Sequence, residues 1–200
     1  MKIIGIVGGS GAGKSLFCSL LEKEGIPTIN TDITARKVVK KGSPCLKELC
    51  EYFGDGILLT SGELNRKELA RIAFSDKEKH ESLNRITHYY IVREVEKWLS
   101  DRERDGAVAA CVDAPLLFES GLDKICFETV AVVAPLDDRI KRICARDGID
   151  EEDALSRIRS QKSDEELCAI CTRTVENNGG TKELLVKAKE LARIYKEGQP

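Results

Sequence analysis

The feature that most constrains the fold lies within the first fifteen residues. A short apolar run over residues 2–7 leads into Gly8-Gly-Ser-Gly-Ala-Gly-Lys-Ser15, which satisfies the pattern G-x-x-x-x-G-K-[ST] in full. Apolar residues at helical spacing follow over about 13–24, so strand, loop and helix occur in the order that the pattern requires. The sequence therefore predicts an α/β protein that holds phosphate groups in this loop.

The residue types of the loop explain how it would bind a nucleotide. Glycines permit positive φ and close approach of backbone N–H groups to phosphate oxygens, and the following helix adds its positive end. Lys14 is expected to reach the β- and γ-phosphates, and the Ser15 hydroxyl to ligate Mg²⁺. The chain contains no Asn-Lys-x-Asp guanine motif. This argues against a GTPase and leaves ATP as the expected nucleotide.

The remaining chain alternates between strand and helix signals. Further strands are expected at 26–30, 107–112, 128–133 and 173–176, with helices between them and a last helix from about Lys182. Such alternation favours a parallel sheet covered on both faces. The 60–100 block has helical spacing throughout, with a break near Ser75, and is expected to form a helical insertion beside the sheet.

The composition limits which binding partners and which cellular compartment are expected. Lys plus Arg number 32 against 34 Asp plus Glu, so the chain offers no basic stripe for nucleic acid or an anionic membrane surface. No window approaches the roughly 18 apolar residues of a membrane helix, which favours a cytoplasmic protein. The eight cysteines are then expected to be reduced thiols, and Cys168-Ala-Ile-Cys171 lacks a second ligand pair at zinc spacing.

Two acidic residues follow apolar runs where the carboxyl ends of parallel strands gather ligands. Asp32 could orient the acceptor hydroxyl and accept its proton, or it could cap a helix beginning at about Ile33. Asp113 could hold magnesium or its water, or it could be a turn residue before Pro115.

A group of cations precedes Gly148 and predicts a mobile cover over the phosphates. Two helices that carry arginines toward a hinge are typical of a lid that neutralises charge and excludes water. The alternative is an ordinary solvated amphipathic helix. The basic residues concerned are Arg139, Lys141, Arg142 and Arg146, with Arg157 and Arg159 after the glycine.

Taken in order and spacing, these segments resemble the dephospho-coenzyme A kinase family from Ile4 to about Tyr195. The resemblance is carried by the phosphate loop and by two more specific runs, Ile29-Asn-Thr-Asp-Ile-Thr-Ala-Arg36 and Pro115-Leu-Leu-Phe-Glu119. Further matching positions are Gly62 to Arg66, His88, Arg142, Arg146, Gln161 and Asn177-Asn-Gly179.

The resemblance implies Mg²⁺-dependent transfer of the ATP γ-phosphoryl group to the ribose 3′-hydroxyl of dephospho-CoA. By this resemblance Asp32 is the base, and Lys14 and Arg142 complete the catalytic set. The acceptor-binding set it implies is Asp32, Arg36, Arg66 and His88. The ATP-binding set it implies is Gly9, Gly11, Ala12, Gly13, Lys14, Ser15, Leu16, Arg142, Arg146 and Asn177, with Asn177 near adenine.

The resemblance also implies an adenylate-kinase-like architecture with a five-stranded parallel sheet. A single kinase unit would comprise a core of 1–58, 106–138 and 170–200, a helical acceptor-binding insertion at about 59–105 and a lid at about 139–165. A monomer or weak homo-oligomer is expected. The alternatives are another small-molecule kinase of this architecture, for nucleoside monophosphates or shikimate-like acids, and a non-catalytic ATP-binding module.

Overall fold

A computed structural model describes residues 1–197 and divides the chain into two compact units. The sheet unit comprises Met1–Asn30 and the chain from Leu99 onward, and the helical unit comprises Thr31–Trp98. The last three residues of the expected core segment 170–200 lie outside the described residues. The expected insertion at 59–105 remains a prediction, because compactness alone does not show which residues bind an acceptor.

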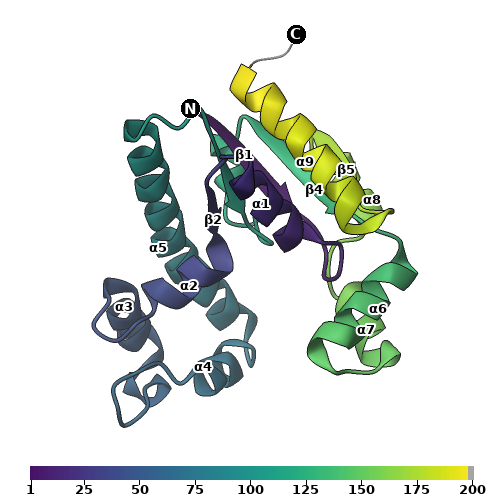
Figure 1. Ribbon diagram of the computed structural model, residues 1–200. Helices are drawn as coiled ribbons and strands as arrows, with labels where there is room; N and C mark the ends of the chain where they lie inside the picture. The colour runs from purple at the N-terminus through teal and green to yellow at the C-terminus, as the bar shows by residue number, and fades with distance from the viewer. Residues whose placement is uncertain (198–200) are drawn as a thin grey trace. The chain divides into compact units, whose positions relative to one another are not determined.

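The sheet unit is built on five parallel strands, as predicted (Figure 1). Their order across the sheet is β2-β3-β1-β4-β5. The interior strands are short apolar runs, which suits a sheet buried on both faces. The strands are β1 (Lys2–Val7), β2 (Thr28–Asn30), β3 (Ala109–Asp113), β4 (Glu128–Val133) and β5 (Arg173–Glu176).

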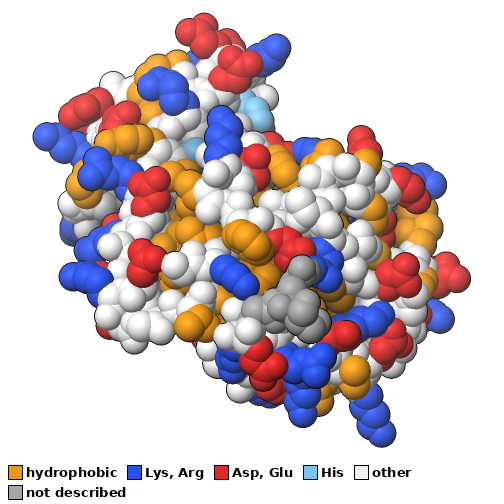
Figure 2. Space-filling view, turned by 90° about the horizontal axis from the view of Figure 1, so that it is seen from above, with side chains coloured by type: hydrophobic (Ala, Val, Ile, Leu, Met, Phe, Trp, Pro, Cys, Tyr) orange, Lys and Arg blue, Asp and Glu red, His pale blue; other side chains and the backbone are white. Residues whose placement is uncertain are grey.

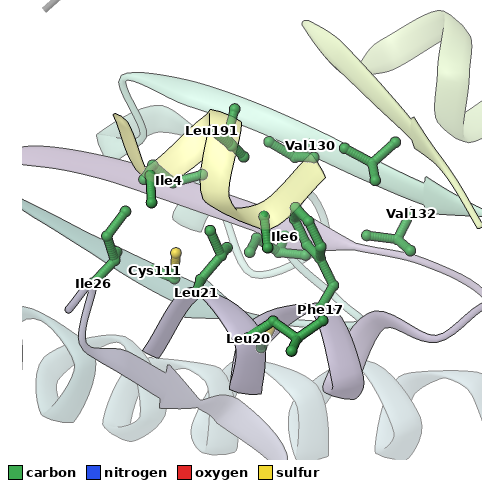
Figure 3. Close-up of a cluster of buried hydrophobic side chains, with 14 of the residues drawn as sticks. Ile4, Ile6, Phe17, Leu20, Leu21, Ile26, Cys111, Val130, Val132 and Leu191 are labelled. Atoms are coloured by element: carbon green, nitrogen blue, oxygen red, sulfur yellow. The ribbon is translucent and has the colours of Figure 1, made fainter. Parts of the chain in front are cut away.

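Helices α1 (Lys14–Lys23) and α9 (Gly180–Glu197) pack together in the main hydrophobic core. Figure 3 shows Phe17 and Leu21 of α1 in one cluster with Ile6 and Val132 of the sheet and Leu191 of α9. Burial of such side chains contributes about 1.5–3 kcal/mol each. This core fixes the start of α1, and hence the glycine-rich loop, at the carboxyl end of β1.

Three further helices follow β4 in the sheet unit: α6 (Leu136–Asp147), α7 (Glu151–Arg159) and α8 (Asp164–Ile170), while the 3₁₀ turn η2 (Leu122–Ile125) precedes β4. The expected pair of helices around Gly148 is confirmed, with that glycine at φ 67° as the C-cap of α6. Helix α8 was not expected from the sequence. It begins with a capping box between Ser163 and Glu166 and packs against β4.

The helical unit contains α2 (Thr31–Val38), α3 (Pro44–Phe53), η1 (Asp55–Ile57), α4 (Arg66–Ala73) and most of α5 (Lys77–Arg104). Ser43 caps α3 and Asn65 caps α4, each accepting a hydrogen bond from the backbone three residues on. Helix α2 begins at Thr31, two residues before the predicted start at Ile33. Asp32 therefore lies in the first turn of α2 and is not its N-cap.

No helix within residues 1–197 is long and apolar enough to cross a lipid bilayer. On the face that Figure 2 displays, basic and acidic side chains are interspersed. This mixture follows from the nearly balanced composition of 32 basic and 34 acidic residues.

Candidate nucleotide-binding site

The glycine-rich loop joins β1 to α1 at the point where the sheet order reverses, between β3 and β4. Open α/β sheets bind ligands at this position. Gly11 and Gly13 adopt φ values of 77° and 97°, which residues with a Cβ rarely adopt. Gly13 is the N-cap of α1 and supplies no side-chain cap. The first N–H groups of α1 are thereby left for an anion.

Three successive carbonyl groups of the loop accept hydrogen bonds from buried or half-buried side chains. Arg139 Nε donates to the Ser10 oxygen at 2.9 Å, Arg142 Nη1 to the Gly11 oxygen at 3.1 Å and Asn177 Nδ2 to the Ala12 oxygen at 2.9 Å. In a trans peptide the C=O and the next N–H point in opposite directions. The Gly11 N–H therefore points away from the Arg139 guanidinium, and the Gly13 N–H points away from the Asn177 amide.

The same side chains explain why the loop is rich in glycine. A Cβ at Gly9 would overlap the Arg139 guanidinium, and a Cβ at Gly13 would overlap the Asn177 amide. Asn177 is only 3% exposed, so it cannot move aside into solvent. Glycine is thus required both for backbone conformation and for the close approach of the supporting side chains.

Lys14 forms an ion pair with Asp113, the last residue of β3. Asn30, at the end of β2, donates to the second oxygen of the same carboxylate at 2.6 Å. Asp113 is a buried strand residue with 2% exposure, so its interpretation as a turn residue is wrong. A buried carboxylate needs such partners, because an unpaired one would lose its hydration without compensation.

The arginines of the predicted lid divide into two groups. Arg139 and Arg142 bind the loop, as described above, whereas Arg146 lies beyond it and donates twice to Asp147, at 2.7 and 2.8 Å. Arg157 of α7 pairs with the same carboxylate. The hydrogen bonds from Arg146, and then from Arg157, lower the pKa of Asp147 to about 2. This cluster ties α6 to α7, and the lid limits of 139–165 remain a prediction.

The helical unit brings together two of the residues expected at the acceptor. Arg36 and Arg66 line one pocket of about 460 Å³, together with Lys40 and Lys41. Asp32 is exposed on α2, one turn before Arg36 and on the same helix face. His88 is half-buried on α5 and does not line this pocket.

The model of the dephospho-CoA kinase family matches residues 2–183. The chain belongs to this family. Dephospho-CoA kinase of Corynebacterium efficiens is 40% identical over 191 residues, covering 96% of each chain. The enzyme of Listeria monocytogenes is 41% identical over 180 residues and 88% of each chain. As a member of the dephospho-CoA kinase family, the chain is a kinase.

Solved structures share the fold of this chain. A crystal structure from Thermus thermophilus has a TM-score of 0.80 and 33% identity, covering 100% of this chain and 98% of that one. Dephospho-CoA kinase from Campylobacter jejuni, at a TM-score of 0.73 and 24% identity, covers 99% of each chain and shares the fold. A shikimate kinase from Acinetobacter baumannii shares it more distantly, with a TM-score of 0.54 and 16% identity.

The structure gives Asp113 and Arg139 supporting contacts that the sequence does not predict. Of the two interpretations of Asp113, the structure excludes the turn residue and places the carboxylate at the end of β3, beside Lys14. Arg139 was grouped with the mobile lid cations, but it is 4% exposed and held against the loop. No sequence signal separates it from its neighbours on α6.

The eight cysteines are free thiols. Burial raises the pKa of Cys111 and of Cys126 to about 12, so both are protonated at neutral pH. Cys18 and Cys111 belong to the hydrophobic core, where a thiol acts as a small apolar side chain.

Proposed function

We propose that this enzyme transfers the γ-phosphoryl group of ATP to the ribose 3′-hydroxyl of dephospho-CoA, yielding CoA and ADP. The observation that carries the donor half is the loop at residues 8–15, where three successive carbonyls accept hydrogen bonds from side chains outside the loop. Family membership carries the acceptor half, since the relatives named above are dephospho-CoA kinases.

On the donor side, the N–H groups of the loop would bind the β- and γ-phosphates. Lys14 would exchange its partner, leaving Asp113 for a phosphate oxygen as charge develops during transfer. Arg142 and Arg146 on α6 would supply further positive charge when the lid closes, and Asn177 would lie near adenine. The contacts of Gly9, Ala12, Ser15 and Leu16 with ATP belong to the same proposal.

Magnesium is implied by the chemistry, and the residues at the loop suit it. The Ser15 hydroxyl is exposed at the start of α1, and Asp113 provides a carboxylate held against Lys14. Oxygen ligands of this kind are what Mg²⁺ prefers. Ser15 would hold the ion directly and Asp113 would hold it or its water. The ion would neutralise charge on the transferring phosphates.

On the acceptor side, Asp32 would orient the ribose hydroxyl and accept its proton. Four cations line one pocket, Arg36, Lys40, Lys41 and Arg66, together with one carboxylate, Glu63. This excess of positive charge favours an anion, and dephospho-CoA carries a diphosphate. We assign that diphosphate to this pocket and place His88 at the rim of the acceptor site.

The test is turnover with Mg-ATP and a panel of acceptors: dephospho-CoA, nucleoside monophosphates and shikimate. The proposal expects ADP and CoA from dephospho-CoA at a higher kcat/KM than from any other acceptor. Faster turnover of shikimate or a nucleoside monophosphate would replace it with the alternative small-molecule kinase. Nucleotide binding with no turnover of any acceptor would indicate a non-catalytic module.

We further propose that the enzyme acts in the cytoplasm as a monomer or weak homo-oligomer, without nucleic-acid or membrane partners. The balanced charge supports this proposal. Sedimentation velocity over a range of concentrations would measure the oligomeric state, and a dimer stable at nanomolar concentration would contradict it.

A further inference from the structure

Arg139 is a buried cation that links the phosphate loop to the start of α8. Its side chain is 5% exposed; Nε donates to the Ser10 oxygen at 2.9 Å, and Nη1 donates to Asp164 Oδ1 at 2.7 Å. Nη2 has no hydrogen-bond partner within the described residues. Burial deprives a guanidinium of much of its hydration free energy. The presence of the charged group of Arg139 here therefore indicates a function that the apolar stem of the side chain could not perform.

Its partner Asp164 lies near the end of the predicted lid segment 139–165, where local structure ties it to the sheet. Asp164 is the first residue of α8, directly after the Ser163 cap, and α8 packs against β4. The carboxylate therefore holds Nη1 at a point set by the sheet. Since the guanidinium is planar and rigid, fixing Nη1 also fixes the direction in which Nε donates.

The contact with Ser10 sets the orientation of one functional peptide group. The Ser10 carbonyl and the Gly11 N–H belong to the same planar trans unit, so they point in opposite directions. Pulling the carbonyl toward Arg139 aims the Gly11 N–H away from α6, toward the concave side of the loop. Gln161 Oε1 accepts from the Ser10 N–H at 2.8 Å, which fixes the preceding peptide as well.

The loop packs so closely against Arg139 that two of its positions leave no room for a Cβ atom. A Cβ at Gly11 would lie 2.6 Å from the Arg139 carbonyl oxygen, and a Cβ at Gly9 would overlap the guanidinium. We propose that Arg139, oriented by Asp164, is a positioning residue that presets the loop for the β- and γ-phosphates of ATP. This inference rests on the proposed binding of ATP at the loop, and it does not depend on the identity of the acceptor.

The decisive variant is Arg139→Met, which keeps the apolar stem and removes the charge and the donors. We expect the Kd and KM for ATP to rise about tenfold, because a charge-assisted contact that preorganises the site is lost. The KM for dephospho-CoA should change less than twofold. Arg139→Lys retains the charge and a single donor nitrogen, and it should recover part of the ATP affinity. Calorimetric titration with Mg-ATP and steady-state kinetics supply these readouts.

The matched control is Arg173→Met, which breaks a similar arginine–carboxylate pair with Glu128, between β5 and β4. Both variants should lower the Tm of the nucleotide-free protein, but only Arg139→Met should weaken ATP binding. Equal ATP affinity in the two variants would overturn the proposal and reduce Arg139 to a structural ion pair.

A second variant covers the case in which Arg139→Met does not fold. Asp164→Asn keeps the size of the partner and removes its charge, and it should raise the Kd for ATP about threefold. An unchanged Kd in Asp164→Asn would overturn the role of the pair. If Arg139→Met does fold, adding Asp164→Asn to it should weaken ATP binding no further. Failure of the wild-type protein to bind Mg-ATP would refute the ATP site itself, whereas failure to turn over dephospho-CoA would leave this inference standing.

Discussion

The phosphate loop of the sheet unit and the Arg36–Arg66 pocket of the helical unit are built in different ways. The loop is proposed to bind phosphate through backbone N–H groups, and its carbonyls accept hydrogen bonds from Arg139, Arg142 and Asn177. The pocket presents exposed, long, flexible cations. The loop has lost its conformational entropy during folding, whereas the pocket must order its side chains when a ligand arrives. Changes in the loop should therefore affect ATP binding and catalysis, and changes in the pocket should affect acceptor affinity.

The largest expected effect is at Asp32, which lies in the helical unit but is proposed to act on the reacting hydroxyl. Asp32→Asn should lower kcat by about 10³-fold, because general-base catalysis contributes 10²–10⁴-fold. ATP affinity, measured by calorimetry, should be unchanged. Near-normal turnover in this variant would show that Asp32 is not the base. The helical unit would then contribute to binding only.

Next in size is Lys14→Ala in the preset loop. Loss of a cation that gains a phosphate contact in the transition state should lower kcat by about 10²-fold or more. Lys23→Ala, at the far end of α1, is the matched control and should keep its activity. A change in KM for ATP alone, with kcat retained, would show that Lys14 serves ground-state binding only.

A smaller and differently distributed effect is expected at Arg66 in the pocket. Arg66→Gln should raise the KM for dephospho-CoA about tenfold, through loss of a charge-assisted contact, and change kcat less than threefold. Arg71→Gln, on the same helix but outside the pocket, is the control. A loss confined to kcat would place Arg66 with the reacting groups and break the distinction between the two regions.

The smallest effect is expected at Asp147, which links α6 to α7 away from the loop. Asp147→Asn should change kcat by about twofold or less, since exposed ion pairs contribute little. The pKa of Asp147 is lowered to about 2 in the folded protein. The ionised carboxylate therefore stabilises the folded state at pH values above the ordinary aspartate pKa near 4, and this stabilisation is lost as the pH falls through 2. The difference in Tm between wild type and variant should be constant from pH 5 to 8, shrink below pH 5 and be lost only below pH 2. A difference that grew as the pH fell would contradict this account.

Much of the fold could be predicted because its signals are local. The apolar runs and glycines of residues 2–25 specify a strand, a loop and a helix within a few residues of one another. The start of α2 was missed by two residues because Asp32 resembles a cap, although it lies inside the helix. Helix α8 was missed because its seven residues are too few to show a helical period.

The site was predictable only where a motif carries the chemistry. The loop pattern identifies Lys14 and Ser15 directly, whereas the sequence does not distinguish Arg139 from Arg142. Their difference arises from packing: Arg139 is 4% exposed and reaches Asp164, while the Arg142 side chain is 34% exposed. Whether a charge is buried depends on contacts between segments far apart in the chain, which residue spacing does not encode.

The parallel α/β architecture, the phosphate loop and the kinase family follow from the amino-acid sequence alone, because each depends on residue types at fixed short spacings. Folding in three dimensions is what pairs Asp113 with Lys14, 99 residues away, and brings Arg139, Arg142 and Asn177 to successive carbonyls of the loop. The reason is that the direction of the backbone N–H groups at an anion site depends on the side chains that bind the neighbouring carbonyls. Those groups are brought into place by packing of the sheet and helices, which no local pattern specifies.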